Sequence, residues 1–313
     1  MTAIFHQLAA DVTVIERGWL NCNQIVLRSP DRNVLIDSGY GRHASATLRY
    51  VGEALAHAPL HWLINTHCHS DHMGGNRAMR EHYHCRVTIP TGEVKHVVPW
   101  TAQSCWSEQM DQYAEQFQFD DTINAGDAFD AGGLCWLAHA APGHDMDALM
   151  FYAAEAGILV TGDALWERGL GFVWPEPLDA TNPELHIRAA LAALDEIEKL
   201  KPKIVVPGHG APFSTVARSL ADARGRLAAF EKDPVKNARH VCKSLFVFAL
   251  LDKGEMPQAD MAAYLASVPI YRQMREAFLG GSNDEVAARM LGELVAAKAV
   301  TTEGGVLRPM MRA

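Results

Sequence analysis

The residues best suited to chemistry lie in one short run, residues 67–72, which has the pattern HxHxDH. It holds three imidazoles and one carboxylate within six residues, a density of divalent-metal ligands that core packing does not require. His67 and His69 alternate, so on an extended segment both side chains leave the same face and can hold one ion. Asp71 and His72 follow directly, and a turn into a helix would aim them at a neighbouring ion. The run therefore predicts two metal ions side by side.

Two flanking elements must position this run. Residues 60–64 have the apolar composition of a buried strand, and residues 73–83 have helical spacing with Ser70 or Asp71 as the N-cap. Upstream, strand patterns at 12–16, 24–28 and 33–37 are separated by turns, and residues 43–57 have helical spacing. A β-meander is therefore expected to lead into a strand–helix–strand unit that ends at the metal ligands.

Three further ligand candidates each lie at a glycine turn after a short strand pattern. His144 follows a Pro-Gly pair, Asp163 follows a Thr-Gly pair, and His209 is flanked by two glycines. Small residues let the backbone approach an ion closely, and such turns aim a side chain at the mouth of a sheet. Two ions that share a water need more ligands than HxHxDH supplies. We therefore expect these three residues to complete the site.

With these residues together, the chain resembles the metallo-β-lactamase superfamily over residues 12 to about 215. The resemblance implies an α/β fold, the αββα sandwich of two sheets between outer helices, here with a mainly helical C-terminal unit. It implies that the first ion is bound by His67, His69 and His144, that the second is bound by Asp71, His72 and His209, and that Asp163 bridges both. Asp37, after the strand pattern 33–36, matches a family acid that we expect to orient the ligands.

The expected chemistry is hydrolysis. Two divalent cations can lower the pKa of a shared water until hydroxide, the nucleophile, exists at neutral pH, and they can stabilise the charge that develops on the substrate. Asp71 is expected to steer the nucleophile's proton. Zn is the default metal, although Fe or Mn would fit the same mixed ligands. We find no GxSxG motif that would indicate a serine nucleophile.

Within the superfamily the pattern is most similar to the hydroxyacylglutathione hydrolase (glyoxalase II) and lactonase-like group. This resemblance implies a small ester, thioester or lactone as the substrate, although basic residues that would grip glutathione are not evident. The aromatic loop after Asp163 offers Trp166, Phe172 and Trp174 as the wall of a substrate pocket. The alternative is that these rings pack helices onto the sheet.

Two other activities fit the same fold. An RNA-processing nuclease would use the C-terminal unit to hold RNA, but acids nearly match the basic residues of that unit. A persulfide dioxygenase would hold one Fe through His67, His144 and a carboxylate. A non-catalytic binding role is the least expected, because every expected ligand is present.

Composition bounds the partners and the compartment. The 313 residues are 49% apolar and 21% charged, and the net charge of −9 disfavours nucleic acid as the main partner. No run of about 18 apolar residues predicts a membrane span. The first twenty residues lack the pattern of a secretory signal, and the six cysteines lack disulfide or zinc-knuckle spacing. We therefore expect a cytoplasmic protein, away from membranes, with a small-molecule substrate.

Two domains are expected, a catalytic domain at 1–232 and a C-terminal unit at 233–313. Helical patterns at 182–200, with Asn182 as N-cap, and at 214–231 close the first part. The helical patterns of the tail end in a glycine-tipped hairpin, as in a winged-helix unit, while a helical cap or a homodimer element fits equally well. A helix is also expected from the spacing of aromatic and apolar residues over 106–117.

Overall fold

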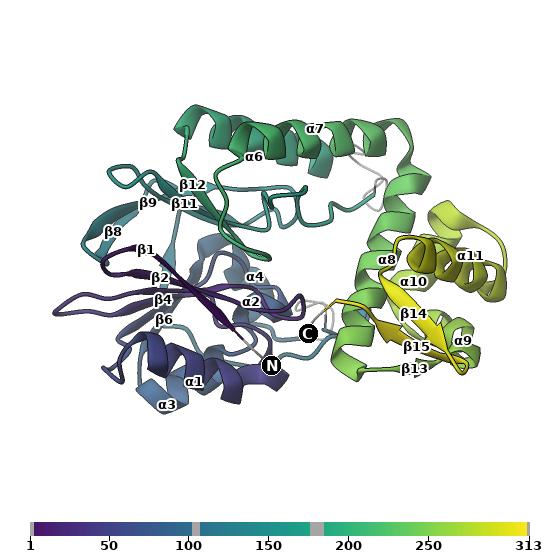
Figure 1. The fold of residues 1–313 in the computed structure, drawn as a ribbon, viewed down its shortest axis with the longest axis horizontal. Coiled ribbons are helices and arrows are strands. Elements are labelled where there is room, and N and C mark those ends of the chain that lie inside the picture. The colour runs from purple at the N-terminus through teal and green to yellow at the C-terminus, as the bar shows by residue number, and fades with distance from the viewer. Residues whose placement is uncertain (1–2, 102–106, 176–184, 312–313) are drawn as a thin grey trace.

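The computed structural model describes residues 3–101, 107–175 and 185–311, and it contains two facing sheets with helices on their outer sides (Figure 1). The first sheet has seven strands in the order β1 to β7. They are β1 (Ile4–Ala9), β2 (Val12–Glu16), β3 (Gln24–Leu27), β4 (Val34–Ile36), β5 (Trp62–Ile64), β6 (Arg86–Pro90) and β7 (Asp121–Ile123). Strands β1 to β4 pair antiparallel, and β4 to β7 pair parallel. The expected meander and the crossover unit are confirmed, and β1 and β7 are additional.

The second sheet has five strands in the order β12-β11-β10-β9-β8. They are β8 (Ala128–Ala131), β9 (Leu134–Ala140), β10 (Leu149–Ala153), β11 (Ile158–Gly162) and β12 (Ile204–Pro207). All neighbours pair antiparallel except β11 and β12, which run parallel because α6 (Leu185–Leu200) crosses between them. The ends of β11 and β12 therefore point in the same direction, and each carries a predicted ligand in the following turn.

Side-chain alternation along the strands produces the layers. In β4, Val34 and Ile36 lie in the core between the two sheets, whereas Leu35 lies in the core under the first helical layer. That layer includes α1 (Ala44–Ala54) and α3 (Asn76–Tyr83), while α6 and α7 (Val216–Lys232) cover the second sheet. The αββα sandwich is confirmed.

A third core belongs to the C-terminal residues. It is formed by α8 (Pro234–Lys253), α9 (Met261–Ser267), α10 (Pro269–Met274), a π-helical turn (Arg275–Leu279), α11 (Asn283–Ala296) and a small sheet of β13 (Met256–Pro257), β15 (Val306–Pro309) and β14 (Val300–Glu303). The side chain of Asp233 caps α8 by accepting from the backbone N–H of Lys236, and Pro234 begins the helix. Leu20 and Tyr40 of the first part share this core, so the two parts pack together. A division at 232/233 stays a prediction.

Short helical turns join these elements. They are η1 (Gly41–His43), α2 (Ser70–Met73), η2 (Thr91–Glu93), α4 (Val94–Val97), α5 (Ser107–Met110) and η3 (Gln258–Asp260). Among the described helices, none is long and apolar enough to cross a membrane.

Two local expectations are wrong. Over 107–117, the described part of the helix predicted at 106–117, only the single turn α5 forms, because Asp111 turns the backbone to a φ of 55° and its carboxylate instead accepts from the Tyr264 hydroxyl and pairs with Lys253. The N-cap of α2 is His69, with no side-chain cap, so Ser70 and Asp71 already lie inside the helix. The predicted N-cap Asn182 lies outside the described residues.

The core between the sheets can be tested at Trp136, which is fully buried and donates from its indole N–H to the Ala131 carbonyl at 3.0 Å. Trp136→Ala should lower the free energy of unfolding by about 3–5 kcal/mol, because it leaves a large cavity. Leu137→Ala, on the same strand but 38% exposed, should change it by no more than about 0.5 kcal/mol. Urea unfolding of both variants measures this, and equal losses would contradict the layer assignment.

Candidate metal centre

All seven predicted ligand residues converge at one edge of the sandwich. The HxHxDH run follows β5 and enters α2, and the three isolated ligands follow β9, β11 and β12. Their donor atoms form two groups, each within 4.8 Å: His67, His69 and His144 in one, and Asp71, His72, Asp163 and His209 in the other. The family resemblance implied the same two sets of three residues, with Asp163 shared between them, whereas here Asp163 falls in the second group.

Asp163 lies between the two groups. Its Oδ2 is 3.4 Å from Nε2 of His144, and its Oδ1 is 3.4 Å from Nε2 of His72. The same Oδ1 is 3.8 Å from Nε2 of His209, whose Nε2 is 3.0 Å from Asp71 Oδ2. Each carboxylate oxygen of Asp163 therefore faces a different group, as a bridging ligand requires.

Hydrogen bonds behind the ligands turn their free nitrogens toward the site. His144 Nδ1 lies 2.6 Å from the Phe172 carbonyl, which fixes the proton there and leaves Nε2 as the donor toward the cluster. The Nε2 atoms of His67 and His72 are buried and, among the described residues, have no hydrogen-bond partner. Buried imidazole nitrogens without partners are costly unless something binds them. Metal cations fit this donor set.

Asp37 contacts the loop that carries the candidate ligands from behind. Its Oδ2 accepts from Thr66 Oγ1 at 2.8 Å and lies 2.9 Å from His72 Nδ1, and its Oδ1 accepts from the Thr66 backbone N–H at 2.8 Å. Asp37 is almost fully buried and has a φ of 60°, an uncommon backbone conformation for a residue other than glycine. Its contacts make it a positioning residue for His72.

Two glycines permit the close approach of the ligand turns. A Cβ on Gly208 would lie 2.2 Å from Asp163 Oδ1, and one on Gly171 would lie 2.8 Å from the His144 ring. Any larger residue at either position would displace a ligand. The glycine beside His209 was expected to serve this purpose, whereas Gly171 was not recognised in the sequence.

The electrostatics of the cluster favour cation binding. Burial lowers the pKa of the His69 imidazole to about 4, with His144 adding to the effect, so His69 is neutral and able to donate a lone pair. Burial opposes charge on Asp163, but His209 and His72 hold its pKa well below the ordinary value. Burial also opposes a charge on His72, yet Cys22, Asp163 and Asp37 raise its pKa well above the ordinary value. The carboxylates therefore favour positive charge at the His72 position, whereas the His69 imidazole is neutral.

Two residues that support the first group were missed in the sequence. Asp145 Oδ2 lies 3.5 Å from His69 Nε2, which turns Nδ1 of His69 toward His144 at 2.8 Å. Glu93, almost fully buried, accepts from the backbone N–H of Cys68 at 3.0 Å. Burial and Asp145 raise the pKa of Glu93 well above the ordinary value. The only sequence feature that could have indicated either residue is that Asp145 directly follows His144.

The cysteines near the site are not arranged as ligands. Cys68 is packed in the core under α1 and α3, away from the two groups, as its alternation with the histidines predicts. Cys22 lies within 4.8 Å of Asp37 and His72, but burial raises the pKa of its thiol to about 11. A protonated thiol is a poor metal ligand. Cys22 therefore belongs to the supporting side of the cluster.

A cavity of about 370 Å³ opens onto the metal ligands. Trp166 and Phe172 line it, as predicted, together with Trp19, whose ring stacks on His209 at 5.5 Å between centroids. Trp174 was predicted to line the pocket, but among the described residues the lining does not include it. Its ring is buried in the C-terminal core and packs against Phe172 at 5.0 Å. Trp174 therefore supports the wall from behind.

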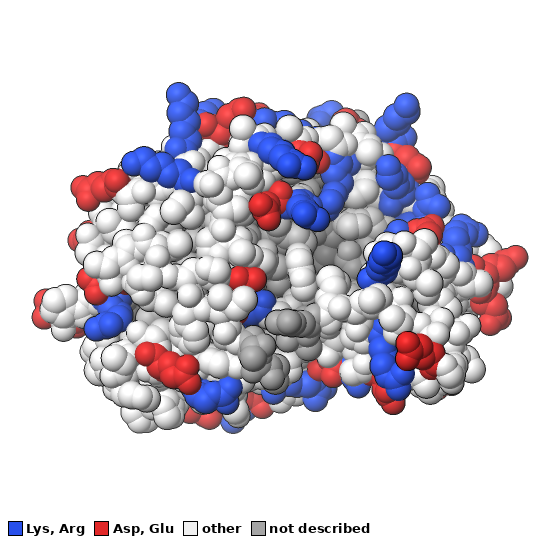
Figure 2. Space-filling model, in the orientation of Figure 1, with Lys and Arg blue, Asp and Glu red and all other residues white. Residues whose placement is uncertain are grey.

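The opposite wall comes from the C-terminal part, which the sequence did not associate with the site. The lining residues from this part include His240, Lys243, Ser244, Val247, Phe248, Leu251, Glu293, Leu294 and Met311. Figure 2 shows the surface hollowed where the two parts meet, with Lys and Arg side chains beside the hollow. The sequence feature that could have indicated this wall is the apolar character of α8 on several sides, because such a helix must be covered on more than one face.

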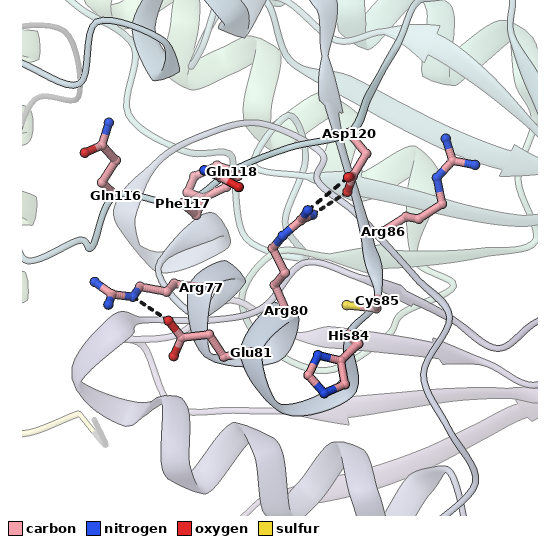
Figure 3. A pocket seen from close by; sticks show the side chains of 10 residues that line it. All are labelled: Arg77, Arg80, Glu81, His84, Cys85, Arg86, Gln116, Phe117, Gln118 and Asp120. Carbon is pink, nitrogen blue, oxygen red and sulfur yellow. Dashed lines mark hydrogen bonds and ion pairs between the residues drawn. The ribbon is translucent and has the colours of Figure 1, made fainter.

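A larger cavity lies apart from the metal ligands, beside α3 and β6 (Figure 3). Its arginines are already engaged. Arg77 pairs with Glu81 at 2.9 Å, and both terminal nitrogens of Arg80 bond Asp120. None of the described metal-ligand groups lies in it. The candidate active site is therefore the smaller cavity.

The fold and the ligand cluster together define a metal-dependent hydrolase. A family model described as the metallo-beta-lactamase superfamily matches residues 17–209, which include all seven ligand candidates. The chain belongs to the metallo-beta-lactamase superfamily.

Known proteins resemble the chain to different extents. A probable metallo-hydrolase of Methanocaldococcus jannaschii is 27% identical over 61% of this chain and 88% of its own length. A hydroxyacylglutathione hydrolase of Rhodopseudomonas palustris is 29% identical, but over only 36% of each chain. A solved beta-lactamase domain protein of Burkholderia ambifaria matches 99% of this chain and 94% of its own, with a TM-score of 0.61 and 20% identity. That last likeness shows the fold alone.

Replacing Asp37 should weaken metal binding without removing a ligand. Asp37→Asn keeps a residue that tolerates positive φ but loses the carboxylate behind His72, so metal affinity should fall by about 10–100-fold. Competition with a chromophoric chelator measures this. Asp31→Asn, at an exposed position, is the matched control and should bind metal as the unaltered protein does.

His240 should make the fold sensitive to acid. Burial, with Arg226 and Lys243 nearby, lowers the pKa of His240 to about 4, whereas the unfolded chain has a pKa near 6.5. Because the unfolded state binds the proton more tightly, stability is lost as pH falls from about 6.5 toward 4. His240→Gln should therefore lose less thermal stability over this range in calorimetry. His82→Gln, exposed on α3, should lose as much as the unaltered protein.

Proposed function

We propose that the protein is a binuclear metal-dependent hydrolase of a small ester, thioester or lactone. The observation that carries this proposal is Asp163, whose two carboxylate oxygens face separate groups of buried imidazoles at 3.4 Å. A mononuclear site would leave the donor atoms of one group without a metal ion to bind. The hydroxyacylglutathione hydrolases among the partial relatives support a thioester or ester as the reacting bond.

Two bound divalent cations would supply an activated water and polarise the substrate carbonyl. The chain's own residues prepare the site for that chemistry. One cation would be held by His67, His69 and His144. The other would be held by Asp71, His72 and His209. Zn suits the mixed imidazole and carboxylate donors, and Fe or Mn would also be accepted.

Asp71 is the acid best placed to handle a proton. It lines the cavity, is less buried than the other carboxylate of its group, and its Oδ2 lies 3.0 Å from His209 Nε2. A carboxylate at this position can orient an attacking water and accept its proton. Trp19 and Trp166 pack against the His209 ring and restrict the access of bulk water to that side.

The size of the cavity supports a small substrate. About 370 Å³ lies at the lower end of the volumes typical for ligand pockets, and aromatic rings line the side near the metal ligands. One small acyl compound fits this space better than a polymer does. The RNA-processing alternative would be favoured by salt-sensitive RNA binding.

Metal removal and ligand replacement test the function. Chelation should abolish hydrolysis of thioesters and esters, and adding Zn, Mn or Fe back should restore it. His67→Ala should lower kcat/KM by more than about 100-fold, because changes even behind metal ligands cost 10–100-fold. His82→Ala, at an exposed position, is the control.

Elemental analysis of the same preparations distinguishes the alternatives. The proposal requires about two equivalents of metal per chain, one for each donor group. A single equivalent of Fe, together with oxygen consumption on a persulfide, would favour the dioxygenase instead. Full turnover after verified removal of metal would overturn any metal-dependent activity.

A further inference from the structure

One face of α8 forms a continuous wall of the cavity. Apart from Leu245, the α8 residues that line the cavity recur at i, i+3, i+4, i+7, i+8 and i+11, which is the spacing of a single helical stripe. They are His240, Lys243, Ser244, Val247, Phe248 and Leu251. We call this set the α8 stripe. At a rise of 1.5 Å per residue it extends for about 16 Å, longer than a minimal ester.

The α8 stripe changes polarity along its length. Its first half, His240 to Ser244, is polar, and its second half, Val247 to Leu251, is apolar. Lys243 Nζ pairs with Glu293 Oε2 at 2.5 Å, and Arg239 Nη1 lies 3.4 Å from Glu293 Oε1. Two cations thus share one carboxylate, and of these three side chains Lys243 and Glu293 line the cavity.

Chains of contacts connect the α8 stripe to both metal-ligand groups. Phe172, which lines the same cavity, packs on the His144 ring at 4.8 Å and against the C-terminal core that includes Val247 and Leu251. At the polar half, His240 packs on Phe230 of α7 at 5.2 Å. Arg226 of α7 donates to the carbonyl of Arg168, in the loop that carries Trp166. The ring of Trp166 in turn contacts His209 at 5.3 Å.

A substrate that lies along the α8 stripe therefore has its reactive bond near both groups, with unlike ends on either side. We propose that the substrate is an amphiphilic thioester or ester, with an apolar chain against Val247, Phe248 and Leu251 and an anionic group near Lys243. This inference rests on the proposed function for the reaction, but its binding pattern can be measured separately.

Binding of a non-hydrolysable amide isolates the recognition step. N-octanoylglycine, an apolar chain with a carboxylate, should bind the metal-loaded protein more tightly than its uncharged primary amide, N-octanoylglycinamide, in calorimetric titration. Lys243→Ala should remove about 10-fold or more of this preference, because hydrogen bonds to charged groups are the stronger ones. Glu293→Gln should increase it, since one carboxylate no longer offsets two cations. Lys236→Ala, an exposed lysine one turn before the stripe, is the control.

Position 247 tests the apolar end in both directions. Val247→Phe adds volume to the cavity wall and should reduce kcat/KM for the longest acyl chains by about 10-fold or more, with acetyl substrates little affected. Val247→Ala should extend the preference to longer chains. Val235→Phe, exposed on the first turn of α8, makes the same type of change away from the cavity. Circular dichroism and metal content establish that each variant is folded and loaded.

Two matched substrate pairs identify which side of the bond carries the charge. One pair is the octanoyl thioester of thioglycolate and that of its primary amide, and the other is the monooctyl thioester of succinate and its primary amide. A charge preference in one pair, lowered by Lys243→Ala, assigns that side. Equal rates within both pairs, or no change on any α8 substitution, would overturn the inference while leaving hydrolysis established. Charge-dependent binding without hydrolysis of any thioester would instead overturn the proposed function.

Discussion

The main constraint on the ligand edge of the fold is that it buries a set of imidazoles and carboxylates, whose removal from water costs free energy. Asp163, His67 and His72 are almost inaccessible to solvent. Buried charges are tolerated only where they are paired, hydrogen-bonded or bound to metal. The site meets this condition by placing a carboxylate oxygen beside each group of nitrogens. Metal binding and folding of this edge are therefore coupled.

The sandwich makes that convergence feasible. Strands β4 and β5 run parallel in one sheet, and β11 and β12 run parallel in the other, so their following turns reach the same edge. Asp37 follows β4 and binds the loop after β5, while Asp163 and His209 follow the two strands of the second sheet. Each sheet contributes candidate ligands to both groups, and neither sheet completes either group alone. The packing of the two sheets against each other therefore brings together the members of each group.

The sequence predicts this edge well because its signals are local. HxHxDH and the glycine turns at His144, Asp163 and His209 report strand ends directly, and all seven ligand candidates converge. The failures arise from tertiary contacts. Asp111 ends α5 by bonding Tyr264 and Lys253, from segments distant in the sequence. Trp174 turns into the C-terminal core, because burying that ring there removes more apolar surface from water than an open pocket would.

The substrate wall illustrates the same limit. A helix pattern shows which residues of α8 share a face, but two of its faces are covered by different neighbours. Phe246 lies in the C-terminal core, whereas Phe248, two residues later, lines the cavity and packs its ring on Tyr40 at 5.4 Å. Nothing local in the sequence separates these two phenylalanines. Tyr40, in the turn after β4, contacts Phe248. This contact decides which phenylalanine lines the cavity, because it places α8 against the edge that carries the candidate ligands. The proposed substrate specificity therefore depends on how α8 docks, and the proposed catalysis depends on the strand ends.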